Sequence, residues 1–193
     1  MKKLGLAIAL CAPLAYADTD VTRLEAAGGT MKWSFVPIGR HERFAHAEML
    51  VSAPVDVVRE QATDFAHYKD MSHGRVQRSR LVDRRPGATD VYLQVPVMRG
   101  MITLWEVLRF SDVHREADGT QSFTGTLVRG NVRAAEMTIR MRPAPSGRSV
   151  VECNLLVTPE FLAPQSMVDS ELRDAAADIV HAFGNRAEQR RAP

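Results

Sequence analysis

Hydrophobic and polar residues alternate along most of the chain between residues 76 and 158, and this period of two predicts β-strands. Turn-forming residues interrupt the alternation, among them Pro86-Gly87 and Asp118-Gly119. Short strands separated by tight turns are typical of an antiparallel, strongly curved sheet. The predicted strands span residues 76–83, 90–97, 101–112, 121–132, 134–142 and 149–158.

Helical spacing occurs on both sides of this strand-rich region. Before it, a strand over 44–52 leads to a helix over 55–62, with Pro54 suited to its first turn and Ser52 to its N-cap, and then to a short helical turn over 64–71. After it, the spacing over 164–188 predicts one long amphipathic helix, which must bury its apolar stripe on the sheet. The stripe consists of Met167, Val168, Leu172, Ala175, Ala176, Ile179, Val180 and Phe183.

The first 17 residues have the three parts of a secretory signal peptide. A positive start at residues 1–3 precedes an apolar run over 4–14, and Ala15 and Ala17 supply the small residues that a signal peptidase reads. The apolar run is too short for a membrane span of about 20 residues. We therefore expect cleavage after Ala17 and a periplasmic or secreted protein, with a buried N-terminal helix as the alternative.

Charge and cysteine content narrow the functional classes. The 193 residues suit one domain and include 25 Lys+Arg against 23 Asp+Glu. Because residues 1–17 hold two lysines and no acid, the remaining chain is charge-balanced, which argues against a nucleic-acid partner. Cleavage also removes Cys11 and leaves Cys153 alone, so no intramolecular disulfide is expected. The histidines lack zinc-ligand spacing, and no phosphate-binding, dinucleotide-binding or serine-elbow motif occurs, so we expect neither metal nor cofactor.

Two segments resemble a known superfamily. Residues 51–58 (VSAPVDVV) and 63–68 (TDFAHY) resemble the opening of START-like (SRPBCC) domains, which include polyketide cyclases/dehydrases, coenzyme Q-binding proteins and START lipid-transfer domains. The predicted order of elements is also that of their helix-grip fold. The resemblance implies an α+β ligand-binding domain over 42–191, with a curved antiparallel sheet wrapped around the long C-terminal helix. Residues 18–41 form an N-terminal extension, either a linker or an extra edge strand.

A sheet curled around one helix encloses an interior, and alternation along each strand indicates which side chains face it. The same apolar side chains can fill a solid core or line a cavity. The resemblance favours a cavity for an apolar ligand. The candidate ligand-binding residues come from four strands and the helix stripe: Tyr92, Gln94, Leu104, Glu106, Leu108, Phe110, Met137, Ile139, Met141, Leu155, Leu172, Ala176, Ile179 and Phe183.

Glu106 is the unusual member of this set. It shares a strand face with Leu104 and Leu108, and an inward carboxylate is costly unless it is paired or protonated. Such a group could orient a polar head group or act as an acid or base. A strand register shifted by one residue would instead place Glu106 in solvent and Trp105 inside.

These features favour an exported, non-enzymatic carrier for a hydrophobic small molecule such as a lipid, isoprenoid, quinone or polyketide. The alternative is a polyketide cyclase or aromatase with Glu106, Tyr92 or His67 as acid–base groups. Export argues against that enzyme, because the polyketide chains that it would act on are made on cytoplasmic carrier proteins. A third hypothesis is a filled domain that acts only through partners, which exposed Trp33 and Phe35 would favour.

The C-terminal end of the long helix is basic. Arg186, Arg190 and Arg191 fit a solvated helix end that the helix dipole favours. Peripheral contact with an anionic membrane is the alternative.

Overall fold

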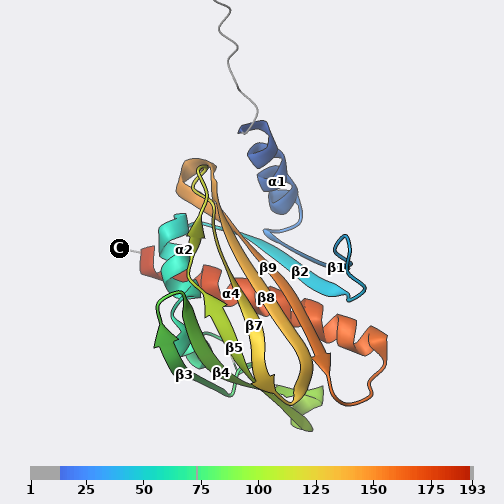
Figure 1. The fold of residues 1–193 in the computed structure, drawn as a ribbon. Helices are drawn as coiled ribbons and strands as arrows, with labels where there is room; N and C mark the ends of the chain where they lie inside the picture. Colours follow the sequence, from blue (N-terminus) through green and yellow to red (C-terminus); the bar gives the residue numbers. More distant parts are fainter. Residues whose placement is uncertain (1–13, 73, 192–193) are drawn as a thin grey trace, which may run out of the picture.

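The computed structural model describes residues 14–72 and 74–191. Within these residues, nine strands form one antiparallel sheet that curves around the long helix α4 (Figure 1). This confirms the expected α+β helix-grip architecture. Strand order is β1-β2-β9-β8-β7-β5-β4-β3, with β6 paired to β7. The strands are β1 (Thr30–Phe35), β2 (Phe44–Val51), β3 (Arg78–Arg85), β4 (Ala88–Val97), β5 (Ile102–Ser111), β6 (His114–Arg115), β7 (Gln121–Gly130), β8 (Val132–Ala144) and β9 (Arg148–Pro159).

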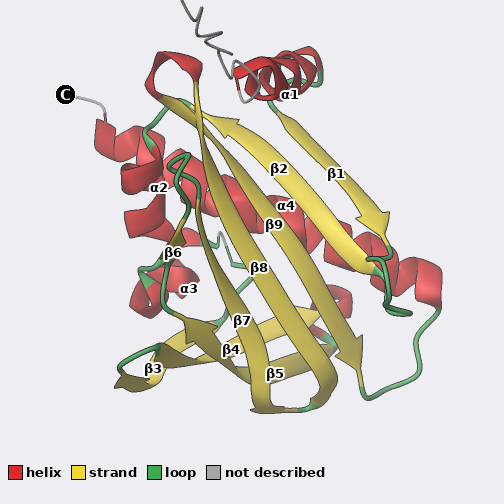
Figure 2. Ribbon diagram, turned by 45° about the horizontal axis from the view of Figure 1, so that its top comes forward, coloured by secondary structure: helices red, strands yellow, loops and turns green. Residues whose placement is uncertain are grey.

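The helices lie at the ends and along the concave face of the sheet (Figure 2). Pro54 occupies the N-cap position of α2 in an extended conformation, with no side-chain cap, so the expected cap at Ser52 is wrong. A cap residue with a fixed φ near −65° and no N–H suits the entry from β2. The helices are α1 (Leu14–Ala26), α2 (Val55–Ala62), η1 (Phe65–His67), α3 (Tyr68–Met71), η2 (Met98–Gly100), η3 (Pro145–Gly147) and α4 (Gln165–Arg191).

The predicted turns connect strands as expected. Pro86-Gly87 joins β3 to β4, and Gly87 has a φ of 82°, which an L side chain rarely adopts. Asp118-Gly119 lies in the turn between β6 and β7, and the Asp118 carboxylate accepts a hydrogen bond from the Thr120 N–H at 2.9 Å. These turns set the register that decides which residues face α4.

The segment before residue 42 contains an edge strand and a helix. β1 pairs with β2 over its whole length, so residues 30–35 form an edge strand of the sheet and not a linker. No helix was predicted over residues 18–26, which α1 includes; Val21 and Leu24 of α1 are buried against Val150 on the outer face of the sheet. Most of the predicted signal peptide, residues 1–13, lies outside the described residues.

α4 packs closely on β2 because small residues meet there. The Cβ of an alanine at Gly184 would lie 2.9 Å from the Met49 Sδ and 3.0 Å from the Val51 side chain. Ala45 and Ala47 on β2 are also fully buried. The helix therefore closes onto this half of the sheet, while larger side chains separate it from the other half.

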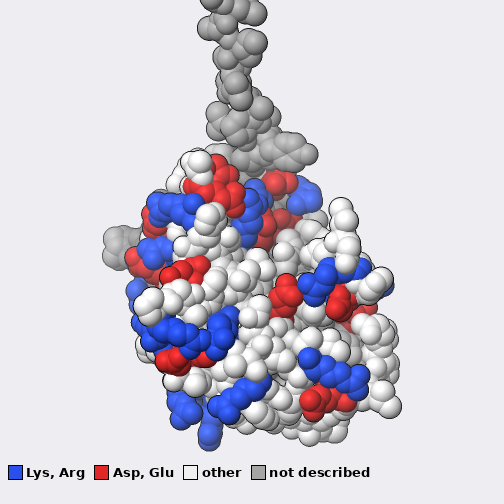
Figure 3. All heavy atoms as spheres, viewed as in Figure 1, with Lys and Arg blue, Asp and Glu red and all other residues white. Residues whose placement is uncertain are grey.

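The opposite edge of the sheet is β3, which carries several exposed arginines, Arg78, Arg80 and Arg84. Charged side chains on an edge strand oppose pairing with another chain. On the face drawn in Figure 3, basic and acidic groups are interspersed, with basic groups gathered at the lower left where Figure 1 places β3.

Candidate functional site

An apolar cavity of about 180 Å³ lies between α4 and the half of the sheet formed by β4, β5, β8 and β9. The short helix α3 and the segment after β9 complete its wall. Its residues are Tyr68, Met71, Ser72, Arg75, Val76, Leu93, Val95, Val97, Met98, Leu104, Glu106, Leu108, Met137, Leu155, Val157, Pro159, Phe161, Ala163, Met167, Val168, Glu171, Leu172, Ala175, Asp178, Ile179, Ala182 and Phe183.

The helix stripe explains the position of one wall. Residues at i, i+3, i+4 and i+7 lie on one face of a helix, and Leu172, Ala175, Ile179 and Phe183 follow this spacing along the cavity. The opposite wall comes from alternate residues of the strands. A cavity remains because α4 stands close to β2 and farther from β4 and β5.

Glu106 occupies the centre of β5, where β7 leaves the regular ladder. Its cross-strand partner is Gly130, and the register shifts between Val107 and Leu108. A Cβ at Gly130 would lie 2.5 Å from the carbonyl oxygen of Trp105, so only glycine permits this approach of β7 to β5.

Asn131 then fixes the backbone of β5 next to Glu106. Its Oδ1 accepts a hydrogen bond from the Trp105 N–H at 2.8 Å, and its Nδ2 donates to the Thr103 carbonyl at 3.0 Å. The Asn131 N–H donates to the Trp105 carbonyl at 3.0 Å. These bonds replace the interrupted ladder and hold the strand so that Glu106 faces the cavity.

One carboxyl oxygen of Glu106 is buried without a partner among the described residues. This oxygen, Oε2, has no hydrogen bond to any residue that the structure describes. Burial away from water disfavours the charged form and raises the pKa of Glu106 from 4.5 to about 7. A group that titrates near neutral pH can bind a cation, donate a hydrogen bond or transfer a proton.

Charged groups also lie along the cavity wall near α4. Arg75 forms an ion pair with Asp178 and a second, at 3.7 Å, with Glu171. Its side chain is 30% exposed, so these pairs are partly hydrated and tie the segment after α3 to the helix. The hydroxyl of Tyr68 donates to the Ala62 carbonyl at 2.5 Å, and burial raises the pKa of this phenol well above 10.

Eight of the fourteen candidate residues line the cavity. Glu106 faces inward, so the shifted register that would have placed it in solvent is wrong. The eight are Leu104, Glu106, Leu108, Met137, Leu155, Leu172, Ile179 and Phe183.

Tyr92 and Gln94 lie on the other face of the sheet, so their assignment to the Glu106 face is wrong. Glu106 pairs with Leu93, whereas Gln94 pairs with Trp105, and paired residues share a face. The Tyr92 and Trp105 rings stack on that outer face, with centroids 6.2 Å apart. Leu93, Val95 and Val97 line the cavity instead.

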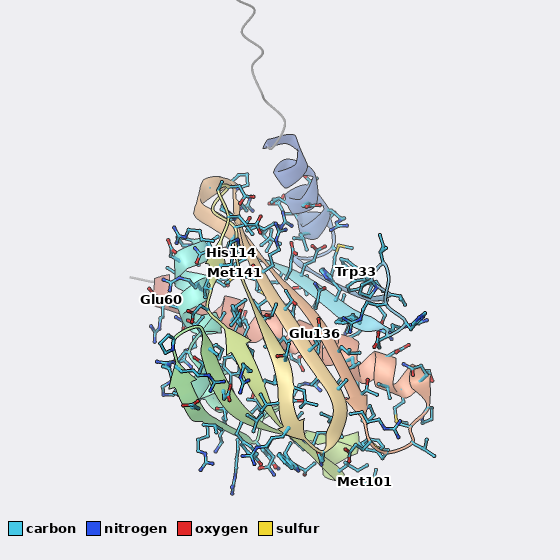
Figure 4. All side chains as sticks on the ribbon, viewed as in Figure 1. Trp33, Glu60, Met101, His114, Glu136 and Met141 are labelled. Atoms are coloured by element: carbon cyan, nitrogen blue, oxygen red, sulfur yellow. The ribbon has the colours of Figure 1, made fainter. Side chains whose placement is uncertain are left out.

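The other four candidates are packed into the solid core. Phe110 is fully buried and stacks on Phe65 with centroids 4.6 Å apart, and Ile139 and Met141 are also fully buried. Met141 lies near His114 at the upper end of the molecule, far from Met101 at the lower end (Figure 4). Ala176 is fully buried in the same core cluster. For these four residues alternation identified the inward face correctly, but it could not show where along that face the core opens into a cavity.

Some residues that line the cavity were not among the candidates. The apolar alternation of Leu93, Val95 and Val97 was visible in the sequence and was a signal for their inward face. Arg75 and Phe161 belong to irregular segments, which have no period from which a direction could be read. Their positions depend on the tertiary fold.

The remaining chemical candidates lie elsewhere. His67 is exposed and bonds the Asp64 carboxylate through Nδ1 at 2.6 Å. Cys153 is fully buried, and burial raises the pKa of its thiol, which disfavours the thiolate nucleophile. Trp33 (Figure 4) and Phe35 are half-buried at the β1 edge. The centroid of the Trp33 ring lies 4.1 Å from that of the His46 ring.

The described residues contain no group of three or more His, Cys, Asp or Glu side chains arranged to hold a metal ion. None of the helices described is long and apolar enough to cross a membrane. A larger hollow of about 470 Å³ borders the cavity at Pro159 and Leu172, but its wall includes Arg43 and Arg133. This polar depression lacks a buried, unpartnered group, so the apolar cavity is the stronger candidate.

Comparison with solved structures identifies the architecture. The STAR-related lipid transfer protein from Xanthomonas axonopodis superposes with a TM-score of 0.71 at 15% identity, covering 83% of this chain and 94% of that one. The chain has a START-like fold. Human StAR-related lipid transfer protein 5 matches this START-like domain with a TM-score of 0.68 at 12% identity, covering 92% and 97% of the two chains.

An aromatase/cyclase shares the same fold. The Zhui aromatase/cyclase from Streptomyces sp. R1128 matches with a TM-score of 0.55 at 18% identity, covering 78% of this chain and 96% of that one. No protein-family model and no curated protein matches the sequence of the START-like domain. At these identities the likeness shows the fold, and function must be argued from the cavity.

Proposed function

We propose that this protein is a carrier or binding protein for a hydrophobic small molecule held in the cavity between the sheet and α4. The observation that carries the proposal is the apolar wall of that cavity, which includes Glu106, whose buried Oε2 has no hydrogen-bond partner among the described residues. Lipids, isoprenoids, quinones and polyketides are the ligand classes that suit such a wall.

Removal of apolar surface from water supplies the driving force for binding. Each square ångström of apolar surface buried contributes about 25 cal/mol. Methionines help a site adapt to ligands of different shape, because their side chains are flexible and polarizable, and Met71, Met98, Met137 and Met167 all line the cavity. Glu106 would fix the orientation of one polar group on the ligand.

We further propose that the carrier is exported and works in the periplasm or outside the cell. The signal-like pattern of residues 1–17 supports this proposal. Cleavage after Ala17 would divide α1 but leave Val21 and Leu24 on the mature chain. The outer face of the sheet would therefore keep its apolar cover.

A cyclase or aromatase is the second candidate, and Glu106 is the observation in its favour. A carboxyl with a pKa of about 7 can exchange protons at neutral pH. The other expected acid–base groups do not join it, because Tyr92 lies on the outer face and His67 is exposed. We favour the carrier, which needs only the cavity.

An Ala175→Trp variant tests the carrier function directly. Ala175 lines the cavity from the middle of α4, and an indole at this position would occupy the space that a ligand needs. We expect titration with the neutral fluorescent probe N-phenyl-1-naphthylamine to show saturable binding to the delipidated wild-type protein. Binding to Ala175→Trp should be at least about tenfold weaker, since a filled cavity offers no apolar surface to bury.

Asn185→Trp is the matched control, because Asn185 is exposed on the same helix. This variant should bind the probe like the wild type, and circular dichroism should show all three proteins folded. Equal probe binding by wild type and Ala175→Trp would refute the cavity as the binding site.

A further inference from the structure

The cavity holds more acidic than basic groups. Among the described residues of its wall, three carboxyls, from Glu106, Glu171 and Asp178, face one guanidinium, from Arg75. Arg75 already pairs with Glu171 and Asp178, the two acids that α4 contributes to this wall. The described wall therefore has no uncommitted positive charge for a negatively charged head group.

Glu106 itself faces only apolar or already bonded groups. The other strands of the wall, β4, β8 and β9, contribute Leu93, Val95, Met137 and Leu155, none of which carries charge. From α3 comes Tyr68, whose hydroxyl already donates to the Ala62 carbonyl. Nothing among the described residues supplies the donor that the buried Oε2 lacks.

We propose that the cavity selects hydrophobic amines, with the protonated nitrogen of the ligand paired to the carboxylate of Glu106. This inference rests on the proposed carrier function and names its ligand class. An ammonium offers three hydrogen-bond donors and no acceptor, so it complements a carboxylate, which is acceptor-only. A charge-assisted bond of this kind is about twice as strong as a neutral one.

Other head groups fit the wall less well. A carboxylate or phosphate would place a second negative charge beside Glu106, which opposes ionisation of both groups. A hydroxyl can donate one hydrogen bond, but it leaves the charge of Glu106 uncompensated at a pH above about 7. The expected order of affinity is therefore amine, then alcohol, then acid.

Three ligands with the same ten-carbon chain separate these possibilities: decylamine, 1-decanol and decanoate. Each is used to displace N-phenyl-1-naphthylamine from the delipidated protein at pH 8 and pH 6, below its aggregation concentration. The proteins are wild type, Glu106→Gln and the control Glu160→Gln, whose side chain is exposed outside the cavity.

At pH 8 we expect wild type to bind decylamine about tenfold more tightly than decanol, with decanoate weakest, in line with a charge-assisted pair. Glu106→Gln should reduce the ratio of amine to alcohol affinity to near one, while Glu160→Gln keeps it. At pH 6 the wild-type ratio should fall, because Glu106 is then mostly protonated. This pH comparison uses the wild-type protein alone, so it still tests the inference if Glu106→Gln fails to fold.

Two results would overturn the inference. If decanol or decanoate displaces the probe as well as decylamine does, the cavity is a carrier site without amine selectivity. If the ratio persists in Glu106→Gln, Glu106 is not the selecting group. Failure of the protein to bind the probe and all three ligands would instead refute the carrier function itself.

Discussion

At the scale of single residues, the distinctive group in the cavity wall is the carboxyl of Glu106, whose buried Oε2 has no hydrogen-bond partner among the described residues. An ionised side chain in an apolar wall costs free energy, and Glu106 responds with a raised pKa. Its inward direction could be predicted, because it shares the apolar face of β5 with Leu104 and Leu108. The faces of Tyr92 and Gln94 were predicted wrongly. They were placed on the face of Glu106, whereas the apolar residues of β4 that face the cavity are Leu93, Val95 and Val97.

A Glu106→Gln variant should change how stability depends on pH. The folded-state pKa of about 7 exceeds the ordinary value of 4.5, so the folded protein binds the Glu106 proton more tightly. This stabilisation is present below pH 4.5 and is lost as the pH rises through 7. Relative to Glu106→Gln, wild type should lose roughly 3 kcal/mol of unfolding free energy between pH 4.5 and pH 8.

Urea unfolding at a series of pH values measures this difference. Glu160→Gln serves as the control and should follow the wild-type profile, because its carboxyl is exposed in the loop after β9. Parallel profiles for wild type and Glu106→Gln would show that Glu106 is not held in a desolvated site.

At the scale of elements, an irregularity in the sheet determines where the functional group points. Gly130 lets β7 approach β5, and Asn131 completes the hydrogen bonds that the ladder omits. The strands and the long helix could be predicted from their periods. The helix α1 could not, because Val21 and Leu24 are too few to form a stripe and its burial depends on the sheet.

A Gly130→Ala variant tests the role of this irregularity. The added Cβ would lie 2.5 Å from the Trp105 carbonyl oxygen and 3.1 Å from the Glu106 Cα, and a backbone cannot yield as a flexible side chain can. We expect a loss of about 1–3 kcal/mol in unfolding free energy, typical of overpacking, measured by urea denaturation.

The exposed Thr124→Ala on the same strand is the control, with an expected change within about 0.5 kcal/mol. A Gly130→Ala protein as stable as this control would mean that β5 and β7 can separate there at no cost. Glu106 would then owe its position to other contacts.

At the scale of the whole molecule, one helix and one curved sheet meet closely along β2 and leave a cavity beside β4 and β5. The predicted order of elements, supported by the resemblance of residues 51–58 and 63–68, was sufficient to predict this architecture. Whether the interior was filled could not be predicted, because a core and a cavity require the same apolar residues. The difference depends on the spacing of α4 from each half of the sheet, which tertiary packing decides.

The central claim is that this cavity carries a hydrophobic molecule, and native mass spectrometry of the protein purified from its own host cells tests it most directly. We expect a noncovalent one-to-one adduct on wild-type protein that organic solvent removes, and none on Ala175→Trp purified in the same way. The intact mass also reports whether cleavage follows Ala17. An adduct-free wild-type protein, or the same adduct on both proteins, would contradict the claim.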